Sequence, residues 1–177
     1  NIAFDDTETI ENITKTMKVD LKVEDNKQYV FLNGEDVSVE IRTPKVTSNV
    51  SEIAAIKEVR AQMVNIQRKL AEGKNVIMEG RDITTVVFPQ ADLKIYMDAA
   101  VETRAQRRYE EMKVKDPHIS YEYVLESIKK RDKMDREKSF GALKMAPDAI
   151  LIDTTHLTIE ETLQKMIDLI EEKLSQK

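Results

Sequence analysis

A regular alternation of apolar and charged residues marks the first element of the chain. Apolar side chains occupy every second position from 17 to 23 and charged ones lie between them, a period of two that is typical of a strand. Asp25 and Asn26 suit a turn, and residues 29–32 resume an apolar run. The pattern predicts a small antiparallel sheet.

Further along, apolar residues recur at spacings of three and four, which is the period of a helix with one buried face. The stripe consists of Ile53, Ile56, Val59, Met63, Ile66 and Leu70. It predicts one helix, and Gly73 is placed to end it.

From about residue 74 the pattern changes to strands and helices in turn. The expected strands are 75–79, 93–98 and 149–153, and the expected helices are 101–114, 121–138 and 159–175. Thr158 and Glu161 form a capping box at the start of the last helix. Near-continuous apolar strands separated by helices predict a parallel sheet covered on both sides, so the fold class is α/β with a small α+β unit ahead of it.

The composition narrows the classes of protein that fit. A net charge of −5 argues against a nonspecific nucleic-acid binder, whose surface must be basic to displace counterions from phosphates. The chain has no cysteine, its two histidines lack metal-ligand spacing, and no apolar run reaches the ~20 residues that span a bilayer. We expect a soluble cytoplasmic protein without a metal site of its own and without membrane or nucleic-acid partners.

The most suggestive charged residues directly follow the strand expected at 75–79. Gly80, Arg81 and Asp82 would lie at its carboxyl end, where open parallel sheets bind ligands. An arginine offers a planar fork of donors to phosphate or carboxylate, and an aspartate can accept from an amino group or hold another arginine. From these residues alone, a local Arg–Asp pair that closes a loop is as good an interpretation as a ligand-binding site.

The helix expected at 101–114 carries a row of arginines. Arg104, Arg107 and Arg108 stand at i, i+3 and i+4, so that they project from one side and could clamp a transferring phosphoryl group. A solvated face paired with Glu110 and Glu111 is the simpler interpretation, and for this helix alone it would be favoured.

The helix expected at 121–138 also aligns charges on one face. Arg131, Asp135 and Lys138 follow one another at i, i+4 and i+7, with Asp132 beside them. Charges at this spacing are usually intrahelical salt bridges worth a few tenths of a kcal/mol. None of these groups is decisive by itself.

The order of the segments is more specific than any one of them, and it resembles bacterial cytidylate kinase, the CMP/dCMP kinase of the nucleoside monophosphate kinase group. The matching strings are FLNGEDVSVEIRTPKVTSNVSEIAA, MEGRDITTVVFPQADLKIYMDA, ETRAQRRYEE, RDKMDRE and DAILIDTTHLTIEE. They come in the family's order and spacing from about residue 29 to the end. An adenylate or thymidylate kinase fits less well, because GRDITTVVFP and the unit before it resemble the cytidylate branch.

The resemblance implies a P-loop nucleoside monophosphate kinase fold, a parallel sheet with an α+β CMP-binding insert. The insert would span about residues 1–60, and residues 61–177 would form the remainder of the core, with a mobile lid at about 104–145. The implied reaction transfers the γ-phosphoryl group of ATP to CMP or dCMP, giving CDP or dCDP, with Mg²⁺ accompanying ATP. A monomer is expected.

Site residues are implied by position in the matching strings. Those that would read the cytosine edge are Ser51, Arg60 and Asp82. Those that would contact the CMP phosphate and ribose are Arg81, Arg131 and Asp135, with Lys138 in place of a nucleotide-contacting arginine of the family. The lid that closes over the transferring phosphoryl group would begin with Arg104, Arg107 and Arg108, which with Arg81 and Arg131 make up the implied catalytic set.

One departure from the family is large. No G-x-x-x-x-G-K-[ST] string, whose amides and lysine cradle ATP phosphates, occurs in the 177 residues. The family's layout places about fifty residues ahead of Asn1, including the central strand of the sheet (order 2-3-1-4-5). Without that strand we expect 75–79 to lack a partner next to 93–98, and the chain alone to be marginally stable and inactive. A truncated or diverged CMP-binding fragment that transfers nothing is the alternative.

Smaller departures lie close to the site. Thr84 replaces a family glycine, and a β-branched residue fits poorly wherever a loop needs positive φ. Lys138 keeps the charge of an arginine but loses its fork. Ala142 and Pro147 change the segment after the lid, and Ala100 removes a helix cap worth about 1 kcal/mol.

Overall fold

The computed structural model describes residues 2–3, 5–137 and 141–176. It divides the chain into two compact units, Asn1–Met78 and Glu79–Lys177. The expected insert ended near residue 60, whereas the first unit extends beyond it, because the helix that follows residue 56 contacts the first helix and the first strand. The assignment of the insert to CMP binding stays a prediction.

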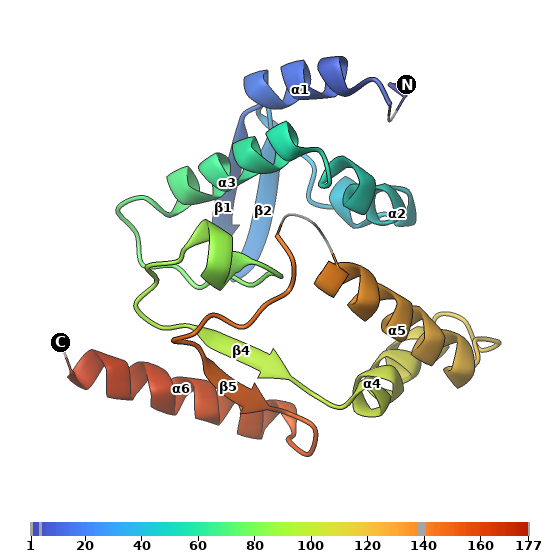
Figure 1. Ribbon diagram of the computed structural model, residues 1–177, viewed down its shortest axis with the longest axis vertical. Helices are drawn as coiled ribbons and strands as arrows, with labels where there is room; N and C mark the ends of the chain where they lie inside the picture. The colour runs from blue at the N-terminus through green and yellow to red at the C-terminus, as the bar shows by residue number, and fades with distance from the viewer. Residues whose placement is uncertain (1, 4, 138–140, 177) are drawn as a thin grey trace. The chain divides into compact units, whose positions relative to one another are not determined.

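The first unit combines a three-stranded sheet with helices (Figure 1). Its elements are α1 (Thr7–Thr16), β1 (Val19–Glu24), β2 (Lys27–Leu32), β3 (Glu35–Asp36), the short 3₁₀ helix η1 (Glu40–Arg42), α2 (Pro44–Ile53) and α3 (Lys57–Ala71). The sheet is antiparallel in the order β1-β2-β3, and the pair Glu24 and Lys27 closes the first hairpin. Asp25 and Asn26 take φ of 50° and 59°, as a tight turn of this kind requires, so the predicted hairpin is confirmed.

Two helices of this unit differ from expectation. The stripe from residue 53 to 70 predicted one helix, but the chain leaves helical geometry at Ile56, whose ψ is 119°. Pro44 occupies the first turn of α2, where its missing N–H costs no hydrogen bond, so it starts a helix there. Gly73, with φ of 68°, follows α3 closely and confirms the expected stop.

Helix α1 was not predicted at all. Its apolar side is short, and only Ile10 and Thr14 of the helix are buried. The start is fixed by Asp6, whose carboxylate accepts a hydrogen bond from the backbone N–H of Thr9 at 3.1 Å. A single cap followed by two buried positions is a weak sequence signal.

The second unit is an α/β arrangement in which two strands lie parallel (Figure 1). Its elements are a π-helical turn η2 (Ile83–Val87), β4 (Ile95–Asp98), α4 (Val101–Lys113), α5 (Tyr121–Glu137), β5 (Ile150–Asp153) and α6 (Ile159–Ser175). β4 pairs with β5 from Ile95 opposite Ile150 to Asp98 opposite Asp153. The expected parallel pairing and the order of the later helices are confirmed, as is the capping box between Thr158 and Glu161.

The prediction of a strand at residues 75–79 is wrong. In the described part of the chain β4 pairs with β5 alone, so the preceding apolar segment has no ladder to join. Ile77 is 93% exposed as a result. Periodicity indicated a strand, but a strand forms only where another backbone supplies its hydrogen bonds.

Helices α4 and α5 pack against each other as a hairpin. Ala105 of α4 and Val124 of α5 are buried apolar residues. Near the connection, the rings of Tyr109 and Tyr121 meet edge to face with centroids 6.1 Å apart, and the ammonium of Lys113 lies 5.3 Å from the centre of the Tyr109 ring. The hairpin therefore has a packed interior.

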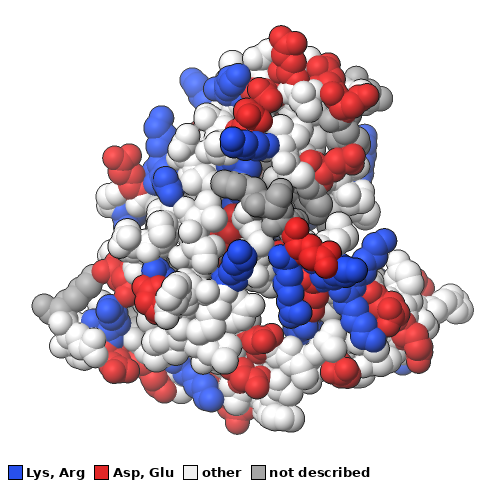
Figure 2. All heavy atoms as spheres, viewed as in Figure 1, with Lys and Arg blue, Asp and Glu red and all other residues white. Residues whose placement is uncertain are grey.

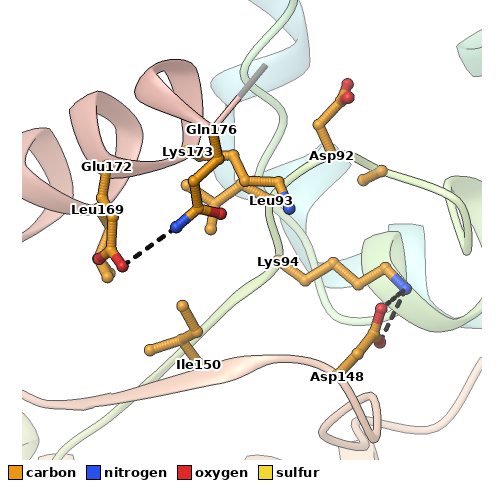
Figure 3. A pocket seen from close by; sticks show the side chains of 10 residues that line it. Asp92, Leu93, Lys94, Asp148, Ile150, Leu169, Glu172, Lys173 and Gln176 are labelled. Carbon is orange, nitrogen blue, oxygen red and sulfur yellow. Dashed lines mark hydrogen bonds and ion pairs between the residues drawn. The ribbon is translucent and has the colours of Figure 1, made fainter.

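A shallow hollow of ≈ 250 Å³ lies where β4 and β5 begin, beside α6 (Figure 3). Lys94, only 7% exposed, points its ammonium at Asp148 and donates to both carboxylate oxygens, at 2.8 and 2.7 Å. The ammonium also donates to the carbonyl of Pro89 at 2.7 Å. Three acceptors thus surround it, which is what a buried ammonium requires.

The Lys94–Asp148 pair makes the stability of the folded protein depend on pH in the acid range. The hydrogen bond from Lys94 lowers the pKa of Asp148 below its ordinary value, so its contribution is present above about pH 4 and is lost as the pH falls further. We predict that Asp148→Asn lowers the melting temperature by several degrees at pH 7, and by less below pH 4. In a Lys94→Met background the same change should cost nothing. Equal losses in both backgrounds would show that the pair is not responsible.

The start of α4 offers a stabilising substitution. Ala100 is its exposed N-cap and has no side-chain acceptor for the first turn, as expected from the sequence. We predict that Ala100→Ser raises the free energy of unfolding by about 1 kcal/mol, because its hydroxyl can accept from the first turn. Urea titration would measure this. Ala100→Val is the control, and an equal gain from it would exclude capping as the cause.

Candidate functional site

Two of the expected site residues meet on a single carboxylate of α5. Arg81 donates from Nε to Oδ2 of Asp135 at 2.8 Å, across 54 positions of sequence. Arg131, one turn earlier on α5, places Nε 3.9 Å from the same oxygen. The Asp135 side chain is buried, whereas those of Arg81 and Arg131 are 49% and 71% exposed. A buried acid thus holds an arginine that is itself half-exposed.

The loop that carries Arg81 is shaped by a π-helical turn. The carbonyl of Asp82 accepts from the backbone N–H groups of Val86 and Val87, at 2.8 and 3.2 Å, and Phe88 donates back to Ile83 at 2.7 Å. Such turns are rare and often occur at functional sites. A side chain at Gly80 would come within 2.9 Å of Ile83, so the glycine allows the close approach.

Within this turn, Asp82 is buried at 6% exposure and Thr84 has a negative φ. The β-branched Thr84 therefore causes no left-handed strain, and the backbone problem anticipated at this position does not arise. Asp82 and Arg81 are adjacent in one tight loop. The side chain of Asp82 is buried, whereas that of Arg81 is half-exposed.

Arg104 forms a forked contact with α5. Its two terminal nitrogens donate to Oδ1 and Oδ2 of Asp132, at 3.0 and 2.8 Å. Its Nε donates to the carbonyl of Ala99 at 2.9 Å, directly after β4. One side chain therefore joins the end of β4 to the second helix of the following hairpin.

The other two arginines of α4 turn to different partners. Arg107 donates to the hydroxyl and carbonyl of Thr154, at 3.3 and 2.7 Å, and to the carbonyl of Leu157 at 3.0 Å. Arg108 makes an exposed pair with Glu111 at 2.9 Å. The three side chains do not converge in this structure, because side chains of this length reach different neighbours from similar positions on a helix. That they clamp a transferring phosphoryl group stays a prediction.

The remaining expected residues are less defined. Arg60 lies half-buried on α3, in the first unit. Ser51 falls within α2, but its side chain lies outside the described residues, as does Lys138. Leu143 donates from its backbone N–H to the carbonyl of Asp135 at 2.8 Å.

An open hollow of ≈ 500 Å³ lies at the carboxyl end of β4. It is lined by Asp98, Ala99, Val101, Arg104, Lys129, Asp132, Lys133, Arg136 and Glu137. Figure 2 shows basic and acidic side chains intermixed over α4 and α5. Sequence reasoning missed the basic residues of this lining other than Arg104, although Lys129, Lys133 and Arg136 stand at i, i+4 and i+7 on one side of the helix.

The described ranges hold no group of three or more His, Asp or Glu side chains that could bind a metal ion. None of their helices combines the length and the apolar composition needed to cross a bilayer.

Comparison with known proteins decides the family. Residues 1–172 match the family model described as cytidylate kinase. Proteins named cytidylate kinase from Caldicellulosiruptor bescii, Caldanaerobacter subterraneus subsp. tengcongensis and Lactobacillus johnsonii are 46%, 47% and 41% identical to the chain. The alignments cover 96%, 96% and 98% of the chain and 75%, 74% and 75% of those relatives.

The chain belongs to the cytidylate kinase family. This confirms the resemblance noted in the sequence, and the parallel pairing of β4 with β5 agrees with the α/β fold of nucleoside monophosphate kinases. The roles that the cytidylate kinase resemblance implies for individual residues stay predictions. Arg81, Asp135 and Arg131 are brought together as such a site would need, and Arg107 and Arg108 are not.

The contacts of Arg107 and Arg108 make a paired prediction. Arg107→Met should lower the free energy of unfolding by about 1 to 2 kcal/mol, because in the loop after β5 the carbonyl of Leu157 loses its side-chain donor and that of Thr154 keeps only the bond from the backbone N–H of Leu157. Arg108→Met should change it by less than about 0.5 kcal/mol, since exposed ion pairs contribute little. Chemical denaturation of both variants would measure the difference. Equal losses would mean that Arg107 does not secure this loop.

Proposed function

We propose that the protein is a cytidylate kinase, which transfers the γ-phosphoryl group of ATP to CMP or dCMP and yields CDP or dCDP. The observation that carries the proposal is the match to the family model over residues 1–172. The structure supports it at the acceptor side, where a half-exposed arginine is oriented by a buried carboxylate.

Arg81 is the residue that we assign to the phosphate of CMP. Asp135 occupies its Nε at 2.8 Å, which fixes the plane of the guanidinium and leaves the two terminal amino groups as a fork for phosphate oxygens. Arg131 adds a second positive charge near the same carboxylate. Positioning and positive charge are most of what phosphoryl transfer asks of a protein, and a single well-placed arginine can be worth about 10³ to 10⁵ in rate.

Asp82 is the residue that we assign to the cytosine edge, together with Ser51 and Arg60. Cytosine presents an amino donor beside a ring acceptor, so a carboxylate suits the donor and a hydroxyl or guanidinium suits the acceptor. A buried carboxylate penalises uracil, which offers a carbonyl at the position of the amino group. Burial of Asp82 therefore supports selection among bases.

ATP and Mg²⁺ belong to the donor side of the proposal. We expect Mg²⁺ to arrive bound to the ATP phosphates, where it would neutralise charge during transfer. The 177 residues contain no G-x-x-x-x-G-K-[ST] string, so we propose that by themselves they supply the CMP side and do not transfer phosphoryl groups. The protein is proposed to act as a monomer.

Two measurements test this proposal. CDP formation from ATP and CMP by the full-length protein tests the reaction, and its absence would contradict the proposed activity. Calorimetric titration of the 177-residue chain with CMP, UMP and AMP tests the acceptor side, where CMP should bind most tightly.

Asp82→Asn should weaken CMP binding about 10- to 100-fold and UMP binding much less, because the amide can donate to the uracil carbonyl. Asp168→Ala, on the exposed face of α6, is the control and should change neither affinity. An unchanged ratio of CMP to UMP affinity in Asp82→Asn would remove Asp82 from base reading.

A further inference from the structure

The side chain of Arg104 differs from the other arginines of the site in how fully it is engaged. All three of its nitrogens have protein acceptors within 3.0 Å, two on Asp132 and one on the carbonyl of Ala99. Arg81 instead meets Asp135 through Nε, and the nearest approach of Arg131 to Asp135 is 3.9 Å. All three guanidinium nitrogens of Arg104 are therefore engaged by acceptors of the protein itself.

Burial strengthens the Arg104–Asp132 contact. The two side chains are 31% and 22% exposed, whereas the pair of Arg108 and Glu111 on the same helix is mostly exposed. A forked pair that is partly withdrawn from water is held more firmly than a surface pair, and removing one partner leaves the other charge without compensation. A phosphate could take the fork of Arg104 only by displacing Asp132.

The contact also leads directly to the acceptor side. Asp132 and Asp135 are three residues apart on α5, so they are neighbours on one face of the helix. Asp132 is bound by Arg104, which is itself fixed to the end of β4, and Asp135 binds Arg81. Because both carboxylates are on α5, the contact that orients the helix at Asp132 also determines the position of Asp135.

We propose that Arg104 is a positioning residue, which fixes α5 against the end of β4 through Asp132 and so places Asp135 and Arg81 for the acceptor nucleotide. This replaces the phosphate-clamping role implied for Arg104 by the family resemblance. The proposal rests on the cytidylate kinase function proposed above. In this proposal Arg104 and Asp132 both serve to fix α5 against the end of β4. A phosphate-clamping role, in contrast, would involve the arginine alone.

The shared task gives the test. In the full-length protein, Asp132→Asn, Arg104→Lys and the double variant would be compared by steady-state kinetics with CMP and ATP varied separately. We expect each single variant to raise the KM for CMP about tenfold, with the KM for ATP and kcat changed by less than about twofold. The double variant should be no worse than either single one, because both remove the same contact.

Glu126→Gln is the matched control. It makes the same acid-to-amide change on α5, in an exposed pair with Lys129, and should leave the kinetics unchanged. Thermal melting of each variant would establish that it is folded at the assay temperature. If Asp132→Asn proves unstable, Asp132→Glu retains the charge but moves it, and should raise the KM for CMP alone.

The opposite pattern would overturn the proposal. If Arg104→Lys turned over at least about 100-fold more slowly while Asp132→Asn was unaffected, Arg104 would contact the transferring group directly. Additive losses in the double variant would also overturn it. Failure of the proposed function looks different, since the unmodified full-length protein would then form no CDP.

Discussion

The organisation of the second unit depends on one helix face that carries two carboxylates. Asp132 and Asp135 of α5 each bind an arginine from an earlier element, Arg104 from α4 and Arg81 from the loop before η2. The forked pair of Arg104 and Asp132 fixes direction as well as distance, because a planar guanidinium donates to both carboxylate oxygens in few orientations. The strand end, the helical hairpin and the Gly-Arg-Asp loop are thereby tied to a common support.

This support explains how an exposed arginine can still be held in one orientation. Arg81 is half-exposed, as a ligand-binding group must be, yet its Nε is held by a buried acid. The same reasoning separates the arginines by role. Those whose nitrogens are occupied by protein acceptors, such as Arg107, serve the fold, and those that are held at one nitrogen and otherwise reach solvent suit a ligand.

The sequence predicted the elements that carry their own period and caps. The hairpin turn at Asp25 and Asn26, the capped helix after Thr158 and the parallel pairing of β4 with β5 were all accessible from local pattern. Failures had two physical origins. The stripe from residue 53 to 70 runs across a break at Ile56 that periodicity does not reveal, and residues 75–79 required a backbone partner that periodicity cannot supply.

The candidate site was predicted as a set of residues but not as a set of contacts. Spacing identified the charged faces of α4 and α5, yet it could not show that Arg104, Arg107 and Arg108 would choose three separate partners, because that choice depends on tertiary neighbours. Similarly, Asp132 looked like an ordinary intrahelical partner, and only the structure pairs it with Arg104.

The claim that α5 and the Gly-Arg-Asp loop form one acceptor surface can be tested by hydrogen exchange of the 177-residue chain with and without CMP. If the account is correct, CMP will slow exchange of backbone amides in both residues 81–88 and residues 131–137, and AMP at the same concentration will slow neither. Protection of only one of the two segments by CMP, or equal protection by AMP, would contradict it.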